Sequence, residues 1–138
     1  DNTRKMNDVV NYSLNHCASL YGLSGMQLRI LLEIGQNGSH TVGSLANNVL
    51  IAGANISSMC KKLESMGMLT RIRDREDERV VKIYLTPQSK SIIEEVNDYY
   101  EKKFIKAIGE GLIENLDAII AAIEKVNELF IKINREEG

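Results

Sequence analysis

Tryptophan is absent from this chain of 138 residues, which also has only one proline, two histidines and two cysteines. A single proline leaves long stretches free to form helices, because proline removes a backbone donor and interrupts helices. The two histidines lie in separate predicted elements, and neither cysteine has another cysteine or a histidine at metal-ligand spacing. The sequence therefore predicts no metal site, and we expect no cofactor.

Sequence motifs of catalysis are missing as well. The chain has no glycine-rich phosphate loop, no nucleophile beside a partnered base and no cluster of histidine, cysteine and carboxylate residues. We therefore expect a protein that is not an enzyme. No apolar run approaches the ~20 residues that a membrane-spanning helix needs, and no segment of the secretory type opens the chain. These absences predict a cytoplasmic protein with no membrane partner.

The two cysteines, Cys17 and Cys60, are open to two interpretations. Free cysteine is among the most buried residue types, which favours two reduced thiols packed on helices. A redox-sensing thiol is the alternative.

The composition is that of an ordinary globular protein, with 43% apolar and 26% charged residues, and the length suits one domain. The formal net charge of −2 is unevenly distributed. Between Lys61 and Lys82 seven bases stand against five acids, whereas from Ile83 onward seven bases stand against eleven acids. Bases are therefore concentrated in a short central segment of an acidic chain.

Apolar residues at helical spacing predict a first helix over residues 6–20 and a second helix that begins after Ser24. Ser24 and Gln27 have the form of a capping box, in which each side chain satisfies the backbone N–H of the other residue. Thr41 is the expected N-cap of a short third helix. A break at residues 51–53 separates this third helix from a fourth.

The fourth predicted helix ends at Gly67 and has two different faces. Its apolar stripe consists of Ile56, Met59, Cys60, Leu63 and Met66. Its polar positions include Asn55, Ser58, Lys61 and Lys62. Two helices joined by a short glycine-containing turn match the helix-turn-helix, whose second helix enters the major groove of DNA.

A β-hairpin is predicted directly after these helices. Partly alternating apolar residues over 68–73 and 80–85 predict two strands, and the polar stretch 74–79 forms the tip. Thr86 and Pro87 then begin a fifth helix, because threonine is a good N-cap and proline fits the first helical position. A hairpin in this place is typical of the wing of a winged helix, which lays basic side chains along phosphates or into the minor groove.

Two long helices complete the predicted fold. The fifth helix runs to a break at residues 109–111, and the last helix carries apolar residues from Leu112 to Ile133. Their apolar stripes are wider than a small winged-helix core covers, so a second copy of the chain is the expected cover. The predicted fold class is therefore mainly α with a small β-hairpin wing, a winged helix-turn-helix plus a helical dimerisation region.

A series of short motifs runs through the central segment in a fixed order. It comprises Leu23-Ser24 with Gln27, Val42-x-x-Leu45-Ala46, Ile56-Ser57, Lys61-Lys62-Leu63-Glu64-x-x-Gly67, Arg71, Asp77-x-Arg79 and Leu85-Thr86. Together with the order of the elements, these motifs resemble the multiple-antibiotic-resistance regulator (MarR) family of winged helix-turn-helix transcriptional regulators. The likeness covers residues 23–86 motif by motif and only the order of helices elsewhere. The chain departs from the family pattern over residues 87–90, where a glycine is usual.

The resemblance implies one MarR-like domain over residues 1–138, with a DNA-binding lobe at 23–86 and a helical dimerisation region at 1–22 and 87–138. It further implies a homodimer that binds a near-palindromic operator in double-stranded DNA, and we expect a repressor. The residues expected to contact DNA are Asn55, Ser57, Ser58, Lys61, Lys62, Arg73, Arg75 and Arg79. Asp77 is expected to position the wing, with one arginine paired to it and another in the minor groove.

Alternatives stay open at several of these positions. The polar residues of the fourth helix and the wing are also compatible with an ordinary solvated surface, whose arginines pair with neighbouring acids. A winged-helix module that dimerises without binding DNA is the alternative function. The resemblance also implies a small aromatic or anionic effector between the helical base and the lobe. Its proposed site residues are Tyr12, His16, Met26 and Arg29, and for His16 a purely structural role competes.

The resemblance also bears on Cys17. In the thiol-based peroxide sensors of this family the reactive cysteine lies early in the first helix, whereas Cys17 lies at the predicted end of that helix. The buried-thiol interpretation is therefore retained.

Overall fold

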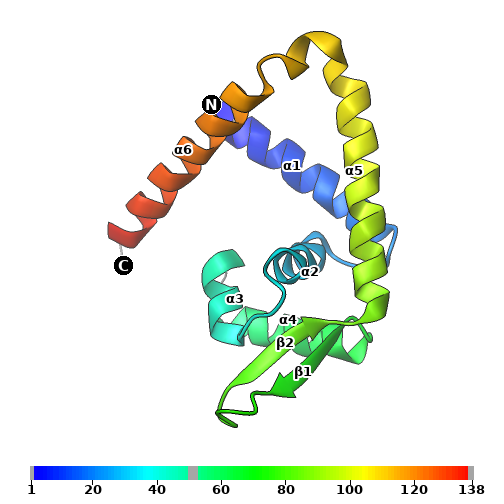
Figure 1. Ribbon diagram of the computed structural model, residues 1–138, viewed down its shortest axis with the longest axis vertical. Coiled ribbons are helices and arrows are strands. Elements are labelled where there is room, and N and C mark those ends of the chain that lie inside the picture. The colour runs from blue at the N-terminus through cyan, green and yellow to red at the C-terminus, as the bar shows by residue number, and fades with distance from the viewer. Residues whose placement is uncertain (1, 50–52, 137–138) are drawn as a thin grey trace. The chain divides into compact units, whose positions relative to one another are not determined.

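The computed structural model describes residues 2–49 and 53–136 and forms two compact units, Asp1–Asn97 and Asp98–Gly138. The elements are α1 (Asn2–Ser19), α2 (Gly25–Asn37), α3 (Val42–Val49), α4 (Gly53–Ser65), β1 (Leu69–Arg73), β2 (Val81–Leu85), α5 (Pro87–Ile113) and α6 (Leu116–Glu136) (Figure 1). α5 begins in the first unit and continues into the second, which also contains α6. Across the described residues, helices with a single antiparallel hairpin confirm the predicted fold class.

The predicted boundaries differ from the observed ones at the starts of the first and last helices. α1 begins at Asn2 rather than at residue 6, because no helix-breaking residue precedes its apolar stripe. The predicted break at residues 109–111 is confirmed as a kink inside α5, where Gly109 has the non-helical backbone angles φ 61° and ψ 174°. The last helix, however, begins at Leu116, so Leu112 and Ile113 belong to the segment of α5 that follows the kink. Of the predicted break at 51–53, residues 51 and 52 lie outside the described part of the chain.

The predicted N-caps of α2 and α3 are confirmed, and both are reciprocal. The Gln27 N–H donates to Ser24 Oγ at 3.1 Å, and the Ser24 N–H donates to Gln27 Oε1 at 2.9 Å. At α3 the Ser44 N–H donates to Thr41 Oγ1 at 3.1 Å, and the Thr41 N–H donates to Ser44 Oγ at 3.0 Å. Each pair satisfies backbone donors that have no partner within the first turn, so the local sequence sets where these helices begin.

The predicted N-cap of α5 is also confirmed, and its hydrogen bonds extend beyond its own helix. The Thr86 N–H donates to Ser89 Oγ at 3.0 Å, and the Ser89 N–H donates to Thr86 Oγ1 at 3.3 Å. The two hydroxyls in turn donate to the backbone after α4, Thr86 Oγ1 to Gly67 O and Ser89 Oγ to Met68 O, each at 2.7 Å. The start of α5 is thereby joined to the turn that ends α4 and begins the hairpin.

The core of the first unit is built around α2. Its buried residues are Gly25, Leu28, Ile30, Leu31 and Ile34. Side chains from the other elements pack with them, and the fully buried ones include Leu45, Ile56, Leu63, Ile83 and Val96. Burial of large aliphatic side chains is the main favourable term in folding. α2 packs against α1, α3 and β2, whereas α4 packs against α3 and β1.

His40 connects α3 to the hairpin. Its N–H donates to Ile83 O at 3.2 Å and its carbonyl accepts from the Ile83 N–H at 2.7 Å, so His40 forms a β-bridge with the middle of β2. The buried ring lies with Nδ1 3.1 Å from Ser44 Oγ and Nε2 3.6 Å from Glu33 Oε1. The Glu33 carboxylate also accepts from Asn48 Nδ2 at 2.9 Å. This polar contact network therefore connects α2, α3 and β2.

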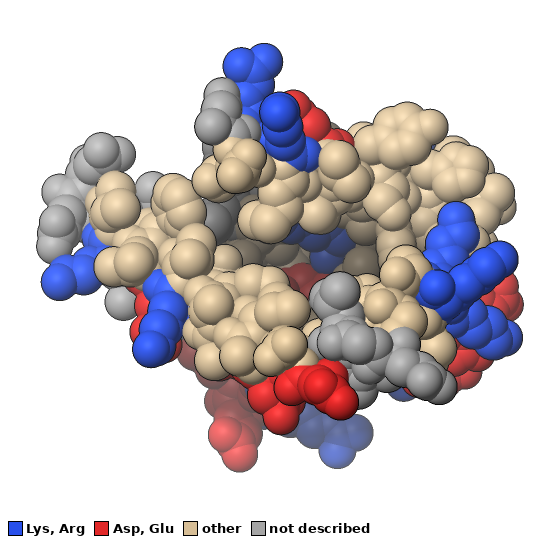
Figure 2. All heavy atoms as spheres, turned by 90° about the horizontal axis from the view of Figure 1, so that it is seen from above, with Lys and Arg blue, Asp and Glu red and all other residues tan. Residues whose placement is uncertain are grey.

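The second unit leaves its apolar side chains on the surface. Its Tyr99 and Tyr100 rings are edge to face at 5.5 Å, and Lys103 Nζ lies 4.7 Å from the centre of the Tyr99 ring. The exposed large apolar residues of α6 are Ile119, Ile120, Ile123, Val126, Leu129, Phe130, Ile131 and Ile133. On the face drawn in Figure 2, uncharged residues cover most of the surface.

Within the described ranges, every helix is either too short or too polar to pass through a lipid bilayer.

Two serines in the first turns of α5 offer a matched test of the cap. Ser89→Ala is expected to lower the free energy of unfolding by roughly 1–3 kcal/mol, because a backbone donor and a backbone acceptor lose their partner. Ser91→Ala, at an exposed helical position, is expected to change it by less than about 0.5 kcal/mol. Urea titrations followed by circular dichroism measure both, and equal effects of the two changes would contradict the assigned role of Ser89.

Candidate nucleic-acid interface

α4 presents a polar face because its apolar face is buried. Ile56, Cys60 and Leu63 are all 0% exposed, so the opposite side of the helix is turned to solvent. The predicted contact residues there are Asn55, Ser58, Lys61 and Lys62, which are exposed, and Ser57, which is half-buried. The structure thus brings the five positions predicted on this helix together on one accessible surface.

Gly67 ends α4 as predicted, at a position where a left-handed backbone is required. Its φ is +72°, a conformation that glycine adopts without the steric cost of a side chain. The Met68 N–H donates to Leu63 O at 2.9 Å and the Gly67 N–H donates to Glu64 O at 3.0 Å, which satisfies carbonyls at the end of the helix. The chain then turns directly into β1, so the wing starts beside the end of α4.

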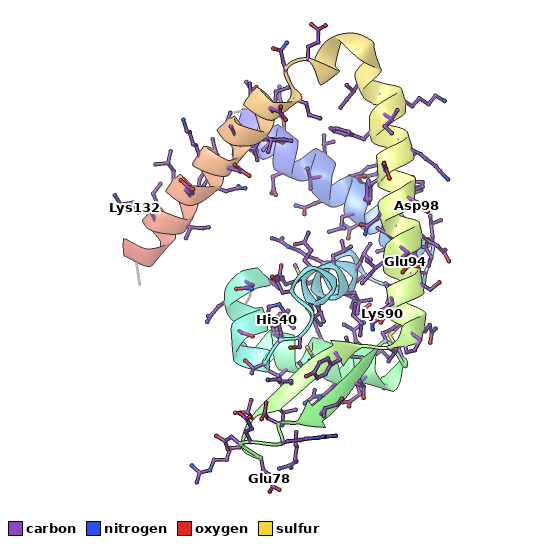
Figure 3. All side chains as sticks on the ribbon, viewed as in Figure 1. His40, Glu78, Lys90, Glu94, Asp98 and Lys132 are labelled. Atoms are coloured by element: carbon purple, nitrogen blue, oxygen red, sulfur yellow. The ribbon has the colours of Figure 1, made fainter. Side chains whose placement is uncertain are left out.

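The wing is a regular hairpin with a structured tip. Its register pairs Leu69 with Leu85 at the base and Arg73 with Val81 at the outer end. Beyond that pair, the Asp74 N–H donates to Val80 O at 2.8 Å. Figure 3 shows Glu78 at the outer end of the hairpin, away from α2 and α3. The side chains of the tip are therefore held on a defined backbone.

Two aspartates shape the tip through backbone hydrogen bonds. Asp74 Oδ1 accepts from the Glu76 N–H at 2.9 Å, and Asp77 Oδ1 accepts from the Arg79 N–H at 3.0 Å. Such aspartate turns stabilise tight loops because the carboxylate replaces a backbone acceptor. Asp77 thus contacts the backbone of Arg79, whereas the sequence led us to expect an ion pair with an arginine side chain.

Two bases of the central segment are used inside the fold. Lys82 Nζ lies 2.8 Å from Asp74 Oδ2, and Arg71 Nε lies 3.0 Å from Glu64 Oε2. Among the described residues, the five other bases of this segment form no ion pair within 4 Å, and all five are exposed: Lys61, Lys62, Arg73, Arg75 and Arg79. Arg73 Nη1 donates to the carbonyl of Glu78 at 3.3 Å, which leaves its charge uncompensated. The sequence alone did not distinguish the paired bases from the unpaired ones.

The ion pair on the wing shifts the pKa values of both partners. The Lys82 ammonium lowers the pKa of the Asp74 carboxyl below its usual 3.8, and the N–H groups of Glu76 and Asp77 lower that pKa further. The Asp74 carboxylate in turn raises the pKa of Lys82 above its usual 10.5. Both groups are therefore charged at neutral pH, and their charges compensate each other.

Both cysteines are buried and neither is part of a disulfide, as the favoured interpretation predicted. Burial raises the pKa of Cys60, an effect that the nearby Arg71 opposes and Glu64 reinforces. A thiol with a raised pKa is a poor nucleophile near neutral pH, because the thiolate is the reactive form. In the described residues, no group of three or more histidine, cysteine, aspartate or glutamate side chains is placed to hold a metal ion.

The four predicted effector residues lie on α1 and α2. Tyr12, His16 and Arg29 are exposed, and Met26 is half-buried. The two helices approach closely near Gly25, whose N–H donates to Asn15 Oδ1 at 3.1 Å. None of the four lines the cavity of about 350 Å³ that opens in the same unit at the other end of α2. That cavity was not predicted from the sequence, because its lining residues come from three elements that are far apart along the chain.

Comparison with known proteins identifies transcriptional regulators as relatives of this chain. A family model described as transcriptional regulator SarA/Rot matches residues 14–96. The HTH-type transcriptional regulator SarZ of Staphylococcus saprophyticus is 32% identical over 75 residues, which are 54% of this chain and 51% of that protein. The HTH-type transcriptional regulator FarR of Neisseria gonorrhoeae is 22% identical over 109 residues, covering 77% of this chain and 75% of its own.

Solved structures share the fold. A MarR family protein from Bacillus stearothermophilus matches with a TM-score of 0.80 at 21% identity, over 94% of this chain and 90% of its own. NadR in complex with 4-hydroxyphenylacetate matches with a TM-score of 0.79 at 17% identity, over 93% of this chain and 89% of its own. These matches confirm the predicted MarR-type winged helix.

The ion pair on the wing predicts a defined pH response. Because the pKa of Asp74 is depressed, its stabilisation of the wing is complete above pH 3.8 and is lost as pH falls through the lower, folded pKa. Lys82→Gln is expected to move the Asp74 pKa part of the way back towards 3.8, since the backbone donors remain. Carbon-detected NMR titration of the carboxyl group measures this pKa.

Arg75→Gln is the control, because Arg75 is an exposed base of the same tip that forms no ion pair with a described residue. It is expected to leave the Asp74 pKa nearly unchanged. An Asp74 titration that is the same in the parent and in Lys82→Gln would show that the ion pair does not form in solution.

Proposed function

The chain belongs to the SarA/Rot family of transcriptional regulators, and we propose that it is a repressor that binds a near-palindromic DNA operator as a homodimer. The observation that carries this proposal is the set of five exposed bases on α4 and the wing that have no acidic partner among the described residues. Phosphate neutralisation by lysine and arginine provides most of the affinity of proteins for DNA, so unpaired bases on a helix and its adjoining hairpin suit a duplex.

The residues of α4 are assigned two different roles. Asn55, Ser57 and Ser58 lie in the first turns of the helix and are proposed to form hydrogen bonds with base edges in the major groove. Lys61 and Lys62 lie further along and are proposed to contact phosphates, which fixes the position of the helix without reading the sequence. Short polar side chains near the start of the helix suggest a modest contribution from direct base recognition.

The wing is proposed to contact the neighbouring minor groove or its phosphates. Arg73, Arg75 and Arg79 are the candidate side chains, and their exposure at the hairpin tip supports this assignment. Asp77 is proposed as the wing-positioning residue, because its carboxylate accepts from the Arg79 N–H and so orients the backbone that carries this arginine. Its role would then be exerted through the shape of the turn.

The dimer is proposed to form through the helices outside residues 23–86, that is, through residues 1–22 and 87–138. On α1, Met6, Val9 and Val10 are 56%, 67% and 57% exposed, and α6 exposes a row of large apolar side chains. A helix is stabilised in water mainly by packing of its apolar face, so the exposed apolar face of α6 requires a packing partner. A second copy provides one, and two lobes would then contact half-sites about one helical turn, ~10 bp, apart.

An effector is proposed as the means of release from DNA. The candidate residues for a small aromatic or anionic molecule are Tyr12, His16, Met26 and Arg29. In support, α1 and α2 pack directly against each other at Asn15 and Gly25, so a ligand on either helix would affect the other. NadR, whose structure shares this fold, was crystallised in complex with 4-hydroxyphenylacetate.

Binding to duplex DNA is tested by two matched lysine substitutions. Lys62→Gln is expected to weaken binding and to reduce the slope of log affinity against log salt by about one, because one phosphate contact is lost. Lys82→Gln is expected to have a smaller effect, because Asp74 already compensates that charge. Fluorescence anisotropy with the duplex upstream of the chain's own gene gives both slopes. Affinity that does not depend on salt in the parent chain would instead support a dimerisation module without DNA binding.

Dimerisation is tested on two faces of α6. Ile123→Glu places a charge among the exposed apolar residues and is expected to shift the chain from dimer to monomer. Lys125→Glu, on the opposite side of the same helix, is expected to leave the dimer intact. Sedimentation velocity of the parent and both variants measures the masses. A parent chain that is monomeric at micromolar concentration would contradict the proposed assembly.

A further inference from the structure

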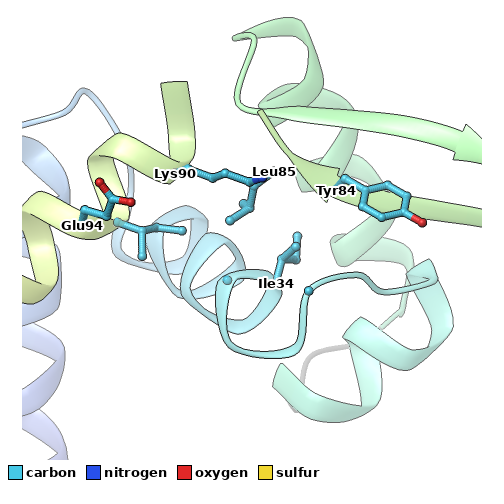
Figure 4. A pocket seen from close by; sticks show the side chains of 8 residues that line it. Ile34, Tyr84, Leu85, Lys90 and Glu94 are labelled. Atoms are coloured by element: carbon cyan, nitrogen blue, oxygen red, sulfur yellow. The ribbon is translucent and has the colours of Figure 1, made fainter. Parts of the chain in front are cut away.

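A cavity of about 350 Å³ opens where α2, β2 and α5 meet, all within the first unit (Figure 4). Ile34, Leu85 and Ile93 are its aliphatic lining residues, and Tyr84 borders it. A volume of this size lies at the lower end of the range of small-molecule sites, which are mostly apolar with a few placed polar groups. The DNA contacts and effector residues proposed above do not line this cavity.

Gly35 allows α2 to lie close to two of the lining side chains. A Cβ at this position would lie 3.2 Å from Ile93 Cδ1 and 3.6 Å from Leu85 Cδ1, and the first of these distances is shorter than an ordinary van der Waals contact. Gly35 is helical and is not among the described glycines with positive φ, so this close approach is the structural reason for the glycine. A larger side chain at position 35 would therefore press on Ile93 and change the lining of the cavity.

Two opposite charges border this apolar cavity. Lys90 and Glu94 lie one turn apart on α5, and Figure 4 shows both on α5 with Ile34 approaching from α2. They are not within 4 Å of each other, since the ion pairs of the described residues all involve other side chains. Lysine placed four residues before glutamate is also the weaker of the two helical orientations. Each charge is therefore available to a ligand.

From these features we propose that the cavity binds a small zwitterion with an apolar body, the chemical class of the free aromatic and branched-chain amino acids. The ligand's carboxylate would pair with Lys90, its ammonium with Glu94, and its side chain would rest on Ile34, Leu85 and Ile93. A simple anion would be repelled by Glu94 and a simple cation by Lys90, so a molecule with one charge satisfies only half of the site.

Such a ligand would contact the three elements that set the position of the wing. β2 belongs to the wing, α5 is joined to its base by Thr86 and Ser89, and α2 is the centre of the core. A ligand that favours one arrangement of these elements changes DNA affinity by its differential affinity for the two arrangements. This coupling rests on the proposed DNA binding, whereas ligand binding itself does not.

The binding experiment uses one amino acid and two analogues that each lack one charge. Isothermal titration calorimetry of the full chain at pH 7 is carried out with L-phenylalanine, 3-phenylpropionate and 2-phenylethylamine, and with L-leucine as a second amino acid. One L-phenylalanine is expected to bind per chain, at least tenfold more tightly than either analogue. Absence of binding by both amino acids, or equal binding of L-phenylalanine and an analogue, would overturn the proposal.

Three variants locate the binding in this cavity. Glu94→Gln is expected to weaken the binding of L-phenylalanine at least fivefold and to strengthen the binding of 3-phenylpropionate. Lys90→Gln is expected to strengthen the binding of 2-phenylethylamine instead. Gly35→Leu is expected to abolish binding, because its side chain would displace Ile93 from the lining of the cavity, and circular dichroism checks that the variant is folded. Binding that survives Gly35→Leu would place the ligand elsewhere and overturn the proposal.

Arg29→Gln is the control, because Arg29 belongs to the separate site proposed on α1 and α2. It is expected to leave the affinity for L-phenylalanine unchanged. A loss of L-phenylalanine binding in this variant would place the amino acid at the site on α1 and α2. Anisotropy with duplex DNA, recorded on the same preparations, keeps the two proposals apart. DNA binding without amino-acid binding overturns this inference alone, and the reverse overturns the proposed function alone.

Discussion

The hydrogen bonds of Thr86 and Ser89 are the constraint on which the arrangement of the first unit depends. A two-stranded hairpin is marginal by itself in water, so the wing needs an anchor at its base. Ser89 is fully buried and donates to Met68 O, while Thr86 donates to Gly67 O. With these bonds, the end of α4, both strands and the start of α5 become one assembly. The direction in which the wing arginines point relative to the lysines of α4 is therefore decided at the base of the hairpin.

Internal ion pairs determine which bases remain available to a partner. A count of charges over the central segment treats Arg71 and Lys82 like their neighbours, yet both are compensated by acids inside the fold. The remaining bases are all exposed and lie on two adjoining elements, α4 and the wing. Net charge alone is thus a poor guide to DNA binding, because a chain with a charge of −2 still presents a locally basic surface.

Features encoded by neighbouring residues were predictable, and features that join distant residues were not. The caps at Ser24, Thr41 and Thr86 rest on residues three positions apart, so a single sequence shows them. The His40 bridge to Ile83 and the cavity beside Gly35 depend on contacts across some forty or more positions, which no local pattern records. The site residues on α4 followed from helical periodicity, because burial of one face determines which residues lie on the other.

The helix α5 links the proposed ligand cavity to the base of the wing. Its first turn is bonded to the backbone after α4, and its next turns carry Lys90 and Glu94 at the cavity. Packed interiors resist continuous deformation, so a shift of this turn is transmitted to β2. Gly35 brings α2 close to Leu85 and Ile93 at the same place, so a ligand held in this cavity would contact α2, β2 and α5 at once.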